Sequence, residues 1–201
     1  MRRTFGALII VACLVVCGRC GRSTDYFPLS PSAQWEYSVD YTGFFGSPQK
    51  GKVVTRVEGT KVINGTTYYT VATVSSGIPG ATNGSKYYRK DTSGIYEFDG
   101  TNEQLFLPSS LEVGRTWTVN EGNQQWTFRV EGIETAHLIS KKYDDCVKIS
   151  FEMVQTTDTI FGAATDRVSG VTYRAQGVGE VKLIVNSQHG KAELSLDSYT
   201  R

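Results

Sequence analysis

Residues 52–75 read KVVTRVEGTKVINGTTYYTVATVS, and this stretch decides the fold. Two runs rich in valine, threonine and tyrosine flank the dipeptide Asn64-Gly65, and these residue types favour half-buried strands. Asn-Gly is typical of the two-residue type I′ turn, because both central residues of that turn need a positive φ. The stretch therefore predicts a β-hairpin with strands over 52–63 and 66–75.

The same kind of pattern continues on both sides of this hairpin. Short runs of alternating or β-branched residues are separated by turns rich in glycine, aspartate and asparagine. No run of about 12 residues after position 25 has a helical apolar period. The sequence predicts an all-β fold, an antiparallel meander of about 10–12 strands. The further strands are expected over 35–41, 86–89, 94–98, 104–107, 116–121, 124–132, 145–156, 168–174, 179–186 and 191–199.

Three sequence blocks occur twice, in the same order and at similar offsets. They are Leu29 with Trp35 and Leu111 with Trp117, then Arg56-Val57-Glu58-Gly59 and Arg129-Val130-Glu131-Gly132, then Tyr88-Arg89 with Gly94 and Tyr173-Arg174 with Gly179. Ordered matches of this kind predict two tandem repeats, 26–105 and 106–201. One unit alone would leave two open sheet edges and one apolar face. We therefore expect the units to join edge to edge as a single domain over 26–201, a curved sheet or open barrel.

The N-terminus has the plan of a secretory signal. Arg2 and Arg3 precede an uncharged apolar run over 5–16, which is too short to cross ~30 Å of hydrocarbon as a helix. A cysteine that closes such a run resembles the lipobox of bacterial lipoproteins, in which this cysteine becomes the new N-terminus and holds the lipid. The resemblance implies lipidation at Cys17, with Cys13 as the alternative.

The lipobox interpretation divides the chain into a signal peptide over 1–17, a tether over 18–25 and the β domain. Ordinary cleavage near 18–21 is the alternative, and it would leave a soluble secreted protein. With lipidation, the expected partner is a membrane, reached through the N-terminal lipid. The expected location is then the bacterial cell envelope, facing the periplasm or the cell surface.

Three further blocks resemble a group of uncharacterised bacterial envelope lipoproteins. The blocks are 26–29 (YFPL) followed by Trp35, 111–117 (LEVGRTW) and 176–182 (QGVGEVK). The group typically has Phe-Pro-Leu before a tryptophan, then Leu-x-Val-Gly-x-x-Trp, then Gly-Val-Gly-x-Val. This chain departs from the pattern at Ser32, where glycine is common. The resemblance implies export, a lipid anchor and a β fold, and it brings no catalytic residues.

The balanced charge and the small numbers of histidines and cysteines argue against several functions. Lysine and arginine total 21 against 20 acidic residues, a formal net charge of +1, which does not suit a broad nucleic-acid surface. His137 and His189 lack partners at metal or triad spacing. Cys146 is expected to be a buried strand residue, with a disulfide to Cys20 as the alternative. We expect no enzyme, no metal and no cofactor, but a non-catalytic binding or structural module.

Aromatic residues mark the candidate surface for a ligand or protein partner. Phe44 and Phe45 lie in a glycine-flanked segment expected to be a loop, where exposed aromatic rings can bind a partner, although a folded-back plug is the alternative. Tyr69 and Tyr88 each have a tyrosine neighbour, so one ring of each pair faces each side of the sheet. These aromatics predict an alternative function, a carrier or chaperone that holds an apolar envelope ligand on a concave sheet.

Overall fold

A computed structural model describes residues 25–43, 46–78, 83–159 and 162–201. Within these ranges the chain forms twelve strands, and every expected strand lies inside an observed one, which confirms the predicted all-β fold. The strands are β1 (Gln34–Gly43), β2 (Gln49–Ile63), β3 (Thr66–Ser76), β4 (Gly84–Lys90), β5 (Gly94–Phe98), β6 (Glu103–Pro108), β7 (Thr116–Glu121), β8 (Gln124–His137), β9 (Lys142–Thr159), β10 (Gly162–Ala175), β11 (Gly179–Ser187) and β12 (Gly190–Thr200).

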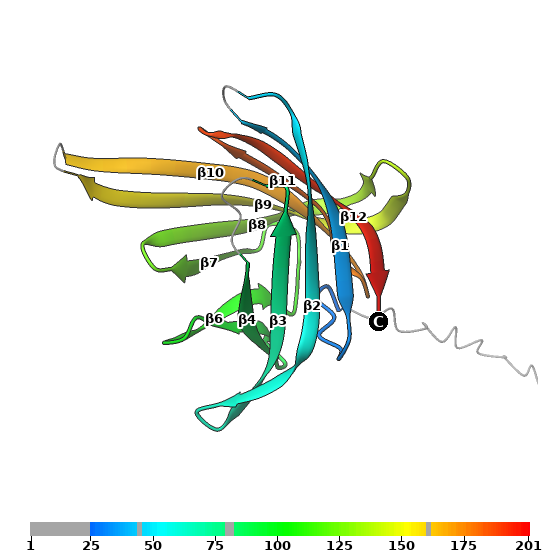
Figure 1. Cartoon of the computed structure of the whole chain (residues 1–201). Coiled ribbons are helices and arrows are strands. Elements are labelled where there is room, and N and C mark those ends of the chain that lie inside the picture. The colour runs from blue at the N-terminus through cyan, green and yellow to red at the C-terminus, as the bar shows by residue number, and fades with distance from the viewer. Residues whose placement is uncertain (1–24, 44–45, 79–82, 160–161) are drawn as a thin grey trace, which may run out of the picture.

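All twelve strands belong to one antiparallel sheet with the order β6-β5-β4-β3-β2-β1-β12-β11-β10-β9-β8-β7. The pairing of the first strand with the last joins the two halves into one sheet, in which blue β1 lies beside red β12 (Figure 1). This sheet curls into a nearly closed barrel. The two edge strands, β6 and β7, meet on the remaining side. Nowhere in the described ranges does a helix reach the length and hydropathy that a bilayer-spanning segment requires.

The hairpin that decided the fold has the predicted geometry. Ile63 pairs with Thr66, and the two residues between them have positive φ values, 48° at Asn64 and 79° at Gly65. These signs fit the type I′ turn, whose twist matches that of the flanking strands.

Matching turns lead into β1 and β7. In both 30–33 and 112–115, the amide of the fourth residue donates a hydrogen bond to the carbonyl of the first at 3.0 Å. The third residue of each turn has a positive φ, 70° at Ser32 and 87° at Gly114. A type II turn needs a positive φ at this position, which glycine adopts at little cost and serine does not.

Matching β-bulges follow in β2 and β8. The register shifts between Val57 and Gly59 in one strand and between Val130 and Gly132 in the other. The Val57 amide donates to the last residue of the first turn at 2.8 Å, and the Val130 amide donates to the last residue of the second turn at 2.9 Å. These features agree with the repeat interpretation, and the duplication itself stays a prediction.

The core lies inside the barrel, where the segment that precedes β1 folds against the sheet. Phe27 packs its ring beside Trp35, Tyr88 and Phe106, with centroids 6.2, 5.2 and 5.6 Å apart. The Trp35 indole N–H donates to the carbonyl of Val178 at 2.6 Å. This aromatic cluster therefore joins residues from both predicted units at one end of the interior.

Candidate functional site

An apolar cavity of about 220 Å³ lies on the concave face of the sheet. Its walls come from β6 to β11, and backbone alternation places their inward side chains on one surface. The apolar lining includes Trp117, Trp126, Phe128, Phe151, Leu183 and Val185. An apolar molecule in this cavity would leave water for a lining that is largely apolar, which is favourable.

One cross-strand row builds the aromatic wall. Trp117 pairs with Phe128, Phe128 with Phe151, and Phe151 with Gly170. Directly opposed residues share a face of the sheet, and the ring centroids are 5.2 Å apart for Trp117 and Phe128 and 6.1 Å apart for Phe128 and Phe151. A Cβ at Gly170 would clash with the backbone carbonyl of Ile184 and with the Phe151 ring. The glycine therefore leaves the room that this ring occupies.

A second cavity, also of about 220 Å³, adjoins the first and shares Phe106, Arg174 and Glu180 with it. Its lining is more polar and includes Thr55 and Thr73, whose hydroxyls are hydrogen-bonded to each other at 3.2 Å. Together the two cavities reach the size range of ~300–1,000 Å³ that is common for small-molecule sites.

Lys86 lies in the second cavity and is held by two carboxylates. Its Nζ is 2.8 Å from Glu97 and 3.1 Å from Glu121. Glu97 is only 4% exposed, and Lys86 is the cation that the structure places beside its buried carboxylate. Burial lowers the pKa of Lys86, but the hydrogen bonds and charges of the two carboxylates outweigh it and raise the pKa above its usual value. Lys86 is therefore cationic at neutral pH.

Arg174 lies at the boundary between the two cavities. The residue is 7% exposed, and its guanidinium is 3.5 Å from Glu180, which also accepts a hydrogen bond from the Thr172 hydroxyl at 2.7 Å. The rings of Phe27 and Phe106 lie 5.9 and 5.8 Å from the guanidinium carbon. Aromatic faces at this distance stabilise a desolvated cation.

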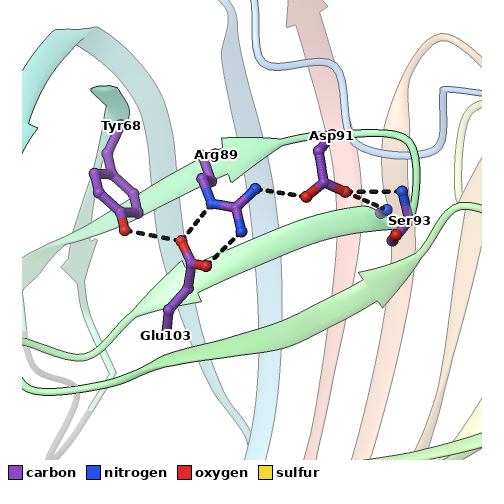
Figure 2. Close-up of polar contacts among 6 residues, drawn as sticks. Tyr68, Arg89, Asp91, Ser93 and Glu103 are labelled. Carbon is purple, nitrogen blue, oxygen red and sulfur yellow. Dashed lines mark hydrogen bonds and ion pairs between the residues drawn. The ribbon is translucent and has the colours of Figure 1, made fainter. Parts of the chain in front are cut away.

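A separate polar cluster ties the edge strand β6 to β3 and β4 (Figure 2). Arg89 donates to Glu103 through two nitrogens and to Asp91 through a third, and Tyr68 donates to Glu103 at 2.8 Å. Arg89 lowers the pKa of Glu103 and of Asp91. The Asp91 carboxylate also accepts the Ser93 amide at 2.7 Å. These mutual hydrogen bonds satisfy the polar groups of the cluster and hold the edge strand β6 against its neighbours.

The structure places two of the four aromatic residues predicted to form a ligand or partner surface. Tyr88 is buried and lines the second cavity, and Tyr69, opposite it in the β3–β4 pair, packs against the core. Burial, and then Glu97, raise the pKa of Tyr88 well above its usual value. Phe44 and Phe45 lie outside the described residues. Their binding role stays a prediction.

Of the four cysteines, the structure likewise describes only some. Cys13 and Cys17 lie outside the described residues, as does Cys20. Cys146 is a buried free thiol whose Sγ donates to the carbonyl of Tyr143 at 3.4 Å, and burial raises its pKa. In the part of the chain that the structure describes, no three histidine, cysteine or acidic side chains group as metal ligands would.

The aromatic wall of the first cavity was not among the predicted site residues. Trp126 and Phe128 are two residues apart, so they share a face of β8. This spacing was a usable signal, but it identifies a wall only when Phe151 is placed opposite Phe128 and Gly170 opposite Phe151. Their placement depends on the register between strands.

No protein-family model and no curated protein matches the sequence. A candidate exported protein with a YmcC-like fold from Bacteroides fragilis has a similar solved structure, with TM-score 0.57 and 13% sequence identity, covering 88% of this chain and 99% of that chain. A candidate lipoprotein from Parabacteroides distasonis gives TM-score 0.49 and 11% identity, covering 89% and 99%. The first likeness shows that the whole barrel is a fold found in another bacterial protein.

Proposed function

We propose that this protein is a non-catalytic binding module of the bacterial cell envelope, anchored by a lipid on Cys17 or Cys13, and that its barrel holds an apolar ligand. The observation that carries the proposal is the aromatic cavity behind β6 to β11. An envelope protein of purely structural type would gain more stability from filling that space, because packed interiors hold few voids larger than a water molecule.

The charged groups at the cavities support binding rather than catalysis. Lys86 is paired with Glu97 and Glu121, and Arg174 is paired with Glu180. Groups held in this way orient and neutralise each other. A general acid or base instead needs a pKa near the working pH and reach to a reacting proton.

The envelope location rests on the N-terminal leader, on the lipobox-like cysteine and on the resemblance to envelope lipoproteins. The matched Bacteroides fragilis fold belongs to a candidate exported protein, which agrees with the same location. A barrel tethered by lipid would lie close to acyl chains, and these are ready apolar ligands.

Ligand binding can be tested with N-phenyl-1-naphthylamine, whose fluorescence rises in apolar sites. The full chain should bind this probe, and Val185→Trp, which fills the first cavity, should weaken binding at least about tenfold. Val62→Trp is the matched control, because Val62 lies on β2 and is 67% exposed. Unchanged binding by Val185→Trp, or none by the parent protein, would contradict the proposed function.

The anchor has a separate test. Metabolic labelling with a fatty acid should mark the parent protein, and Cys17→Ala should lose the label and leave the membrane fraction. Label that persists would move the anchor to Cys13 or Cys20. A parent protein that takes up no label would remove the lipid anchor from the proposal.

A further inference from the structure

The indole nitrogen of Trp126 is buried without a hydrogen-bond partner. The chain has three tryptophans, all within the described residues. The indole N–H of Trp35 donates to Val178 at 2.6 Å, and that of Trp117 donates to Phe106 at 3.1 Å. Buried donors are normally satisfied, so the Trp126 nitrogen needs an explanation.

Among the described residues, the ring and strand neighbours of Trp126 are apolar. Its ring lies 5.8 Å from Phe151 and 6.4 Å from Phe128, and its strand partners are Val119 and Met153. All four are apolar or nearly so, and Trp126 lines the first cavity together with both phenylalanines. An occupant of that cavity is the natural source of an oxygen acceptor.

We propose that the first cavity binds an acyl compound whose carbonyl oxygen accepts the hydrogen bond of the Trp126 indole. This inference rests on the proposed function and names its ligand class. The acyl chain would lie against Phe128, Phe151, Leu183 and Val185. A pure hydrocarbon would fill the same space and leave the donor unsatisfied.

An acyl carbonyl matches the site better than a charged head group. The lining near Trp126 is apolar, and burying an unpaired charge there would cost far more than burying a carbonyl. The nearest guanidinium in the lining, that of Arg174, is already engaged with Glu180. A fatty acid, which would bring a carboxylate, and a neutral acyl ester therefore differ in a way that can be measured.

Competition against the naphthylamine probe tests the inference on the full chain. Methyl decanoate and tridecane have the same number of heavy atoms, and only the ester has a carbonyl. The ratio of ester affinity to hydrocarbon affinity should be about tenfold higher in the parent protein than in Trp126→Phe, the change expected for one buried hydrogen bond. Decanoic acid at neutral pH should bind more weakly than the ester, and tighter binding would assign the site to free fatty acids.

Trp126→Phe keeps an aromatic ring and removes the donor. This variant should lose affinity for the ester, with tridecane affinity unchanged. Trp35→Phe is the control, because its indole already donates to Val178 and its ring does not line the first cavity, and it should keep the parent's ratio of ester affinity to hydrocarbon affinity. A ratio of ester affinity to hydrocarbon affinity that is the same in Trp126→Phe and in the parent would overturn the inference while leaving the proposed function intact. Failure of the parent to bind either compound would defeat both.

A nuclear magnetic resonance readout covers the case in which Trp126→Phe does not fold. With the parent protein labelled at the tryptophan indoles, methyl decanoate should move the Trp126 N–H signal downfield, as a new hydrogen bond does, and tridecane should not. A Trp126 signal that responds equally to both compounds would show that the indole has no role in recognising the carbonyl.

Discussion

The two halves of the barrel meet at two junctions that are built differently. At the first, β1 and β12 form a backbone ladder that runs from Gln34 opposite Thr200 to Gly43 opposite Gly190. At the second, β6 and β7 are the two ends of the sheet order. A backbone ladder depends little on side-chain identity, because every residue except proline supplies the same donor and acceptor.

Side chains make the contacts that the structure shows across the second junction. The Trp117 indole donates to the backbone carbonyl of Phe106 at 3.1 Å, and the backbone N–H of Asn120 donates to the side-chain oxygen of Gln104 at 2.8 Å. Lys86 reaches Glu121 across the same gap. These contacts blunt two strand edges that would otherwise be templates for pairing with another chain.

This difference indicates which strands of the barrel open locally most easily. Phe106 and Trp117 both line the first cavity, so the junction held by side chains is also a wall of the proposed binding site. Local opening in proteins follows the elements with the fewest buried contacts and backbone hydrogen bonds. We therefore expect β6 and β7 to open more readily than β1 and β12.

The largest expected effect on stability comes from removing a buried side chain at the junction of β1 and β12. Leu196 lies on β12 opposite Tyr37 and is 1% exposed. Leu196→Ala should lower the free energy of unfolding by about 2–5 kcal/mol, because it removes buried methyl groups and leaves a cavity. Urea unfolding measures the loss. The control Ile139→Ala, at a side chain that is 84% exposed, should change stability by less than about 0.5 kcal/mol.

The two indole hydrogen bonds compare the junctions directly. Trp35→Phe should cost about 1–3 kcal/mol, because it removes a 2.6 Å bond in the closed, buried cluster and leaves a carbonyl without its donor. Trp117→Phe should cost about 0.5–1.5 kcal/mol and should speed hydrogen exchange in β7 more than in β12. Equal costs with equal exchange in both strands would remove the distinction between the junctions.

Alkaline pH tests the closed side in a different way. Burial, and then Glu180, raise the pKa of Tyr37 well above its usual value, whereas an unfolded tyrosine loses its proton near pH ~10. Above that pH the folded state holds more protons than the unfolded state, so the free energy of unfolding falls as pH rises, by up to about 1.4 kcal/mol per pH unit for this group. Tyr88 and Lys86 act in the same direction.

Tyr37→Phe should flatten this dependence, because phenylalanine cannot ionise. Urea unfolding at pH values of about 9, 10 and 11 would give the slope of stability against pH for parent and variant. Identical slopes in the two proteins would mean that Tyr37 is free to ionise in the folded state.

Local sequence was sufficient to predict where the strands lie, but it did not predict where some of them begin and end. Asn64-Gly65 and the alternating runs specify hairpins through backbone and side-chain preferences that act over a few residues. The β9–β10 ladder, in contrast, continues out to Thr159 opposite Gly162, well beyond the expected 145–156 and 168–174. Backbone pairing extended these strands through residues whose types give a weak strand signal.

The cavity shows the same limit for the site. The sequence analysis selected aromatics that are adjacent in the chain, such as Phe44 with Phe45. The structure instead groups Trp117, Phe128 and Phe151, which meet through register across three strands. Edge-to-edge joining of the halves was also expected, but the choice of β1 and β12 as the paired edges depends on the curl of the whole sheet.

The smallest expected effects concern the turns that lead into the two junction strands. Ser32 precedes β1 and Gly114 precedes β7, and both have a positive φ. Ser32→Gly should raise the free energy of unfolding by up to about 1 kcal/mol, because glycine adopts this conformation without the Cβ penalty, although its unfolded chain has more freedom. Gly114→Ala should lower it by about 1 kcal/mol for the converse reason.

Substitutions in these two turns also distinguish the effect of turn conformation on stability from the strength of the two strand junctions. If the two turns are equivalent, the changes in urea unfolding should be opposite in sign and similar in size. Only Gly114→Ala should speed hydrogen exchange across β7, because that strand lacks a backbone partner on its outer side, whereas β1 is held by β2 and β12. Faster exchange in β1 after Ser32→Gly would show that the turn, and not the ladder, holds the first strand.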